Sequence, residues 1–150
     1  MLNDKVKAKG VVHFVLTDEY GKVKEQHEQN LVVNSGLAHI VSRIIGTSQN
    51  VMSHMAVGTG TTAAAAADTA LQTESARVAL TSTTAVTTTA TNDAVQYVAT
   101  FAPGTGTAAL TEAGVFNDGT TGTMLCRTVF PVINKGALDT LTITWKVTVA

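Results

Sequence analysis

The chain has 150 residues, of which 45% are hydrophobic and only 14% are charged, and its formal net charge is −1. This length and apolar fraction predict one domain with a real hydrophobic core, and the near-neutral charge argues against a protein that mainly neutralises phosphates. Threonine is the compositional outlier with 26 residues, and because it is β-branched it favours strands. The single cysteine, Cys126, excludes an internal disulfide and a multi-cysteine zinc site.

The N-terminal segment, residues 1–10, is charged and has no core-forming pattern, which starts only at Val11. We therefore expect residues 1–10 to be an N-terminal arm, which is either a docking arm or a flexible lead-in, and residues 11–150 to be a single β-sandwich domain. The segment lacks the apolar stretch of a secretory signal. No run of about 18 apolar residues predicts a transmembrane helix.

A β-hairpin is predicted directly after the arm. Residues 11–16 are an apolar run, residues 18–22 have the composition of a turn in which Gly21 can adopt a positive φ, and residues 23–33 return as a second strand. The pattern indicates an N-terminal hairpin with one edge exposed to water.

One helical pattern follows, at about residues 35–46. Asn34 and Ser35 offer an N-cap, and Gly46 is a natural stop. Apolar residues at i, i+3, i+4, i+7 and i+8 share one face of this helix: Leu37, Ile40, Val41, Ile44 and Ile45.

The rest of the chain is predicted to be β-structure with polar breaks. A short buried strand within residues 51–57 leads into an ordered loop over residues 58–70, and the later strands are expected at residues 77–86, 94–101, 113–116 with 124–130, and 141–149. The last strand is the clearest, because its odd positions from Leu141 to Val149 are all apolar. We expect that apolar face to pack on the helix face or on an opposing sheet. The chain as a whole predicts a mainly β fold, an antiparallel β-sandwich with an N-terminal hairpin and one short α-helix.

Two carboxylates, Glu74 and Glu112, stand isolated in uncharged stretches and are the candidates for acid–base chemistry. A glycosidase would need two such groups on opposite sides of a sugar. The alternative is that each pairs with Arg77 or Arg127, or caps a turn. We favour this alternative because neither carboxylate has a recognisable catalytic frame.

The other residues that could react or bind a ligand lack partners at the spacings that are characteristic of known sites. The segment Gly58-Thr59-Gly60 completes neither a dinucleotide-binding motif nor a P-loop, which favours a tight turn over an anion site. Cys126 is predicted to be a buried thiol on the opposite face from Arg127. The histidines have no ligand-type neighbour at i+2 to i+4; they are His13, His27, His39 and His54. The sequence therefore predicts a protein that is not an enzyme, with no catalytic, cofactor-binding or metal-binding residues.

Several phrases of the sequence are characteristic when they are taken together. They are NLVVNSGL at residues 30–37, VGTGTT through DTALQTE to Arg77 at residues 57–77, LTEAGVFN at residues 110–117, and the closing residues 130–135 with LTITW at residues 141–145. This order, over residues from about 10 to 149, resembles small structural proteins of tailed bacteriophages, of the tail-fibre-like, head-fibre or capsid-associated kind.

The resemblance implies a non-enzymatic virion structural protein that is assembled in the host cytoplasm. It implies a homo-oligomer, with a trimer favoured, that docks on the major capsid or tail protein as a decoration, cement, fibre or tail component. Neither nucleic acid nor a membrane is an expected partner. The alternative is a receptor- or glycan-binding module at a fibre tip, in which the polar loops at residues 87–93 and 117–122 would cluster at one end of the sandwich.

Overall fold

The computed structural model describes residues 6–47 and 49–149, and within them the chain forms nine antiparallel strands and one helix. This result confirms the prediction of a mainly β, antiparallel fold with one short helix. In chain order the elements are β1 (Ala8–Thr17), β2 (Val23–Val32), α1 (Asn34–Ile44), β3 (His54–Gly58), β4 (Glu74–Ala79), β5 (Ser82–Val86), β6 (Ala94–Phe101), β7 (Ala108–Phe116), β8 (Met124–Lys135) and β9 (Thr140–Val149).

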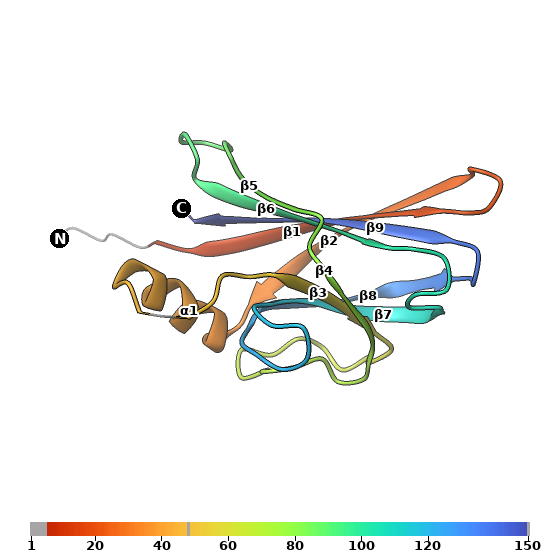
Figure 1. The fold of residues 1–150 in the computed structure, drawn as a ribbon. Coiled ribbons are helices and arrows are strands. Elements are labelled where there is room, and N and C mark those ends of the chain that lie inside the picture. Colours follow the sequence, from red (N-terminus) through yellow and green to blue (C-terminus); the bar gives the residue numbers. More distant parts are fainter. Residues whose placement is uncertain (1–5, 48, 150) are drawn as a thin grey trace.

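The strands belong to one sheet, in the order β4-β3-β7-β8-β2-β1-β9-β6-β5, which curls until its two halves face each other (Figure 1). β5, β6, β9 and β1 lie in the upper layer of that view, and β3, β7 and β8 in the lower one. β2 connects the layers, because it pairs with β1 along most of its length while Leu31 and Val32 pair with β8. This arrangement is compatible with the predicted sandwich.

The predicted N-terminal hairpin is confirmed, but its first strand begins earlier than expected. Gly21 has a φ of +81° in the turn between β1 and β2. β1 starts at Ala8, which pairs with Val149 of β9, so residues 8–10 belong to the sheet and not to an arm. Residues 1–5 of the expected arm lie outside the described residues.

The core lies between the two layers and is built from alternating positions. In β9 the side chains of Leu141, Ile143, Trp145 and Val147 are buried, whereas the residues between them are half-buried on the outer face. The predicted period of two in this strand is therefore confirmed. Trp145 is fully buried.

The expected strand at residues 77–86 is in fact two strands, β4 and β5, at opposite ends of the sheet order. The chain changes layer between them, because the Leu80 N–H donates to the Ser53 carbonyl in one layer and the Thr81 N–H donates to the Val98 carbonyl in the other. Residues 77–86 favour strand structure throughout, so the sequence pattern did not indicate the point at which the chain changes layer. β7 and β8 are also longer than predicted, since β7 begins at Ala108 and β8 extends to Lys135.

The position of α1 was predicted correctly, and the structure shows which of its sides is buried. The buried helix residues are Gly36, His39 and Ser42, and a Cβ at Gly36 would overlap the Leu125 carbonyl of β8. Ser35 does not cap the helix; its hydroxyl donates to the Met124 carbonyl at 2.8 Å. The helix therefore docks on β8 through its small and polar side, and most of its apolar stripe faces outward.

Candidate functional site

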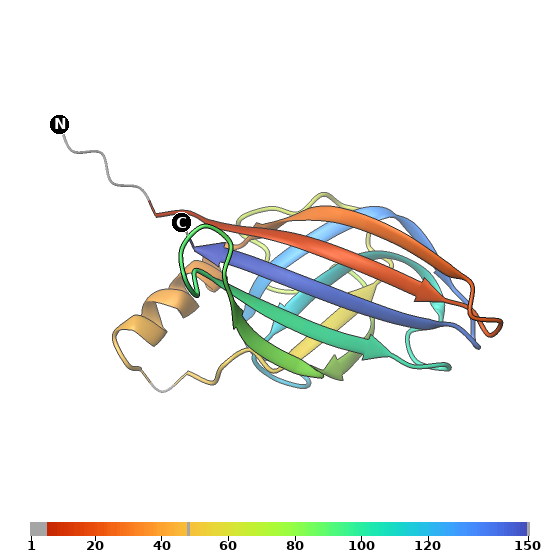
Figure 2. The same cartoon turned by 90° about the horizontal axis from the view of Figure 1, so that it is seen from above.

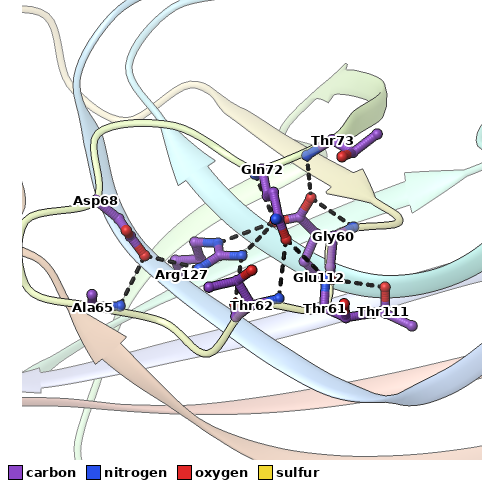
Figure 3. Close-up of polar contacts among 10 residues, drawn as sticks. All are labelled: Gly60, Thr61, Thr62, Ala65, Asp68, Gln72, Thr73, Thr111, Glu112 and Arg127. Atoms are coloured by element: carbon purple, nitrogen blue, oxygen red, sulfur yellow. Dashed lines mark hydrogen bonds and ion pairs between the residues drawn. The ribbon is translucent and has the colours of Figure 1, made fainter.

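Glu112 on β7 is the most buried charged group among the described residues, with no exposed surface. Its carboxylate accepts hydrogen bonds from three backbone N–H groups of the segment 59–73, at 3.0 Å from Gly60, 2.9 Å from Gln72 and 2.7 Å from Thr73 (Figure 3). It also pairs with Arg127 of β8, at 2.8 Å between Oε2 and Nη2. The carboxylate is therefore fully engaged and anchors the two ends of this segment to the sheet.

Arg127 extends the same network across the segment. Its guanidinium pairs with Asp68 at 2.8 Å and donates to the Thr62 carbonyl at 3.0 Å. Leu71 of the segment adds apolar contacts beneath it, in a small cluster with Val33, Ala56, Phe116 and Met124. The segment 59–73 thus forms a cover on the outer face of the lower layer, as Figure 1 shows.

The electrostatics of Glu112 favour its charged form. Burial alone would raise the pKa of this carboxyl group. The backbone hydrogen bonds from Thr73 and Gln72, the guanidinium of Arg127 and the Gly60 N–H together outweigh that effect and hold the pKa below its ordinary value. A carboxylate with these surroundings is charged at neutral pH inside a structural network, and it has no surface exposed to solvent.

The sequence hypothesis that each isolated carboxylate pairs with an arginine is confirmed. Glu74 pairs with Arg77 at 2.7 Å, and Glu112 pairs with Arg127. The two carboxylates therefore serve separate ion pairs. The Gly-Thr-Gly segment is explained by the same network, because a Cβ at Gly60 would overlap the carboxylate of Glu112.

The remaining candidate residues are placed apart from one another. Cys126 is buried, and burial raises the pKa of its thiol well above the ordinary value. His13 and His27 stack on the outer face of the upper layer, with ring centroids 4.2 Å apart, whereas His39 contacts Gln49 and His54 contacts Ser53. Within residues 6–47 and 49–149, no group of three or more His, Cys, Asp or Glu side chains is placed to hold a metal ion.

The two polar loops expected to form a binding end do not lie together. The loop at residues 87–93 is beside the end of β9, where the Val149 N–H donates to the Asp93 carbonyl. The loop at residues 117–123 lies next to β4, where Arg77 donates to the carbonyl groups of Asp118 and Thr121. Figure 1 places them on opposite faces of the molecule.

The outward stripe of α1 is the main exposed apolar feature that sequence reasoning missed. Its side chains are 45–79% exposed, although their spacing is that of a buried helix face: Leu37, Val41, Ile44 and Ile45. Val51, just beyond the helix, is 59% exposed. The signal that could have located this surface is Gly36, which marks the close-packed side of the helix and so leaves the larger side chains outside.

An apolar groove runs between α1 and the inner face of the upper layer. It has a volume of about 480 Å³ and is lined by Ile40 and Ile44 of the helix, Tyr97 of β6 and Val147 of β9. Among its lining residues in the described part of the chain, Arg43 is the only Asp, Glu, Lys or Arg. The stripe and the groove adjoin at Ile44, which belongs to both. Figure 2 places α1 at the end of the molecule where β1 begins and β9 ends.

No helix in the described part of the chain is long and apolar enough to span a membrane. Comparisons of the chain with protein-family models, with curated proteins and with solved structures find no match.

Proposed function

We propose that this chain is a non-enzymatic structural protein of a tailed bacteriophage particle, which self-associates and docks on a larger capsid or tail protein. The observation that carries the proposal is the exposed apolar stripe of α1 beside an apolar groove. Contiguous apolar surface of this kind marks protein–protein contacts, because leaving it in water is unfavourable. The phage context comes from the resemblance in the sequence.

The chemistry of the candidate residues supports a structural role. The two isolated carboxylates, which were the best candidates for catalysis, are occupied in ion pairs with Arg77 and Arg127. Glu112 uses its remaining acceptor capacity on backbone N–H groups of the segment 59–73. These groups fix the outer cover of the sheet, as is expected of a rigid building block.

Sedimentation velocity over a range of protein concentrations tests self-association. We expect concentration-dependent oligomers for the wild type and a shift to monomer for Ile44→Asp, which places a charge in the middle of the stripe. Thr69→Asp is the matched control, because Thr69 is exposed in the segment 59–73, away from α1. A wild type that stays monomeric at the highest concentration would overturn the self-association.

Immunogold electron microscopy tests the docking. Antibodies against the chain are applied to virions produced from the genome that encodes it. We expect gold at a fixed place on the head or tail, and intact, unlabelled particles would overturn the virion assignment.

A further inference from the structure

We propose that copies of this chain associate head to tail, with the turn between β1 and β2 of one copy inserting Tyr20 into the groove beside α1 of the next copy. The inference rests on the proposed self-association and names the two surfaces that meet. The other occupants of the groove, including a second α1, are outcomes of the test below.

The β1–β2 turn presents Tyr20 on an ordered backbone. Tyr20 is 87% exposed. The turn beneath it is fixed by hydrogen bonds from the Asp18 N–H to the Lys22 carbonyl and from the Gly21 N–H to the Asp18 carbonyl, each 3.0 Å long. Asp18 Oδ1 also accepts from the Tyr20 and Lys22 N–H groups at 2.9 Å. An aromatic side chain on an ordered turn loses little entropy on binding, which is typical of interface hot spots.

The surroundings of Tyr20 are acidic and partly apolar. β1 and β9 pair up to Thr17 and Thr140, so the turn at residues 136–139 lies beside the turn at residues 18–22. These two turns together carry three carboxylates, on Asp18, Glu19 and Asp139, and one lysine, Lys22. Leu138 in the second turn is 59% exposed and adds apolar surface to this end of the molecule.

The groove offers the opposite charge. Arg43 lines it and is exposed, and the described lining residues include no Asp or Glu; Asp93 lies outside the lining, in the loop beside Val149. Lys7, just before β1, and Lys9, near its start, are both exposed, and Figure 2 places the start of β1 at the same end of the molecule as α1. The volume of about 480 Å³ falls within the roughly 300–1,000 Å³ of ligand pockets and leaves room for an aromatic side chain.

The two surfaces lie at opposite ends of the molecule. α1, which lines the groove, is at the end where β1 begins and β9 ends, and the β1–β2 turn is the outermost point of the other end in both views (Figures 1 and 2). A contact between unlike surfaces is heterologous, and it repeats into a ring or an open filament. An α1-to-α1 contact would instead be isologous, and it would leave the β1–β2 turns of both copies free.

A mixing experiment distinguishes the two arrangements. Tyr20→Ser removes the anchor, and Ile44→Asp spoils the groove; both side chains are exposed, so both variants are expected to fold, as checked by circular dichroism. Each variant alone should be monomeric in sedimentation velocity. An equimolar mixture should form one-to-one dimers and nothing larger, because one intact turn and one intact groove remain in each pair.

Exchanging the charges of Glu19 and Arg43 tests the proposed electrostatic attraction between the turn and the groove. Glu19→Lys and Arg43→Glu should each weaken association by about tenfold, and the double variant should restore it to within about threefold of the wild type. Thr69→Asp should leave association unchanged. Single variants without effect, or a double variant weaker than either single, would overturn the pairing of turn and groove.

The outcomes separate this inference from the function on which it rests. A monomeric wild type overturns both the self-association and the head-to-tail contact. A wild type that associates, with Tyr20→Ser associating equally well, overturns the head-to-tail contact alone and points to α1 meeting α1. If Tyr20→Ser and Ile44→Asp remain monomeric when they are mixed, the head-to-tail contact is also overturned.

Discussion

Glu112 and Arg127 form an ion pair with 2.8 Å between Oε2 and Nη2, and their side chains are 0% and 2% exposed. They stand on the neighbouring strands β7 and β8, where Gly114 pairs with Arg127, so the pair is diagonal across the ladder. The charges lie on the outer face of the sheet and are buried only because the segment 59–73 covers them (Figure 3). The pair and the cover therefore depend on each other.

Arg127→Met should strongly destabilise the fold. The substitution keeps much of the apolar stem but leaves the charge of Glu112 buried without its guanidinium partner. Breaking a buried pair in this way costs about 3–5 kcal/mol. Urea unfolding followed by circular dichroism measures the change, and Lys24→Met at an exposed position should stay within about 0.5 kcal/mol of the wild type. A loss below about 1 kcal/mol for Arg127→Met would show that the pair does not hold the cover.

The free energy of unfolding should depend on pH through Glu112. Its pKa in the folded state lies below the ordinary value of 4.5, because the N–H donors and Arg127 outweigh the effect of burial. The stabilisation is therefore complete above about pH 4.5 and is lost as the pH falls through the lower folded-state pKa. Urea titrations between pH 7 and 3 measure it. Glu112→Gln should be less stable at pH 7 and should lose less stability than the wild type towards pH 3; parallel curves for the two proteins would contradict this role.

The sequence predicted the ion pairs but not the burial of one of them. Alternation in β8 placed Arg127 opposite the buried Cys126, on a face that a two-layer fold normally leaves in water. That face is buried by the segment 59–73. Because this segment lacks regular secondary structure, its sequence has no hydrophobic periodicity from which its position could be predicted. Its contacts with Glu112 join residues 39–52 positions apart. Contacts of this kind depend on tertiary structure and leave no local sequence pattern.

The helix α1 illustrates a second limit of structure prediction from the sequence. The period of 3.6 correctly identified α1, but it left open whether the face that carries Leu37 and Val41 packs on the last strand or an opposing sheet takes that place. The structure instead packs Gly36 against β8, because only a residue without a Cβ allows the helix backbone so close to the Leu125 carbonyl. Periodicity finds an apolar face but does not say whether this chain or a partner covers it.

Gly36→Val should displace α1 and weaken the surface that the helix carries. The new side chain would overlap the Leu125 backbone, which cannot move without disturbing β8. We expect a loss of about 1–3 kcal/mol, as for other overpacked sites, together with weaker self-association. Ala38→Val, on the exposed side of the same helix, controls for the lower helix propensity of valine. Equal unfolding free energies for the two variants would argue against close packing at Gly36.

Trp145 should anchor the core through the size of its ring and not through its N–H group. The side chain is fully buried, and its Nε1 has no hydrogen-bond partner among the described residues. Trp145→Ala should cost roughly 3–5 kcal/mol, a large share of the stability of about 5–15 kcal/mol typical of a domain.

Trp145→Phe separates ring size from the N–H group. It keeps most of the apolar ring and removes the unpaired donor, whose burial is itself unfavourable by about 1–3 kcal/mol, so we expect a much smaller loss than for alanine. Urea unfolding followed by far-ultraviolet circular dichroism compares the variants without relying on tryptophan fluorescence. If phenylalanine proved as damaging as alanine, the indole N–H would have to make a stabilising bond, and the assignment of Trp145 as a purely apolar anchor would be wrong.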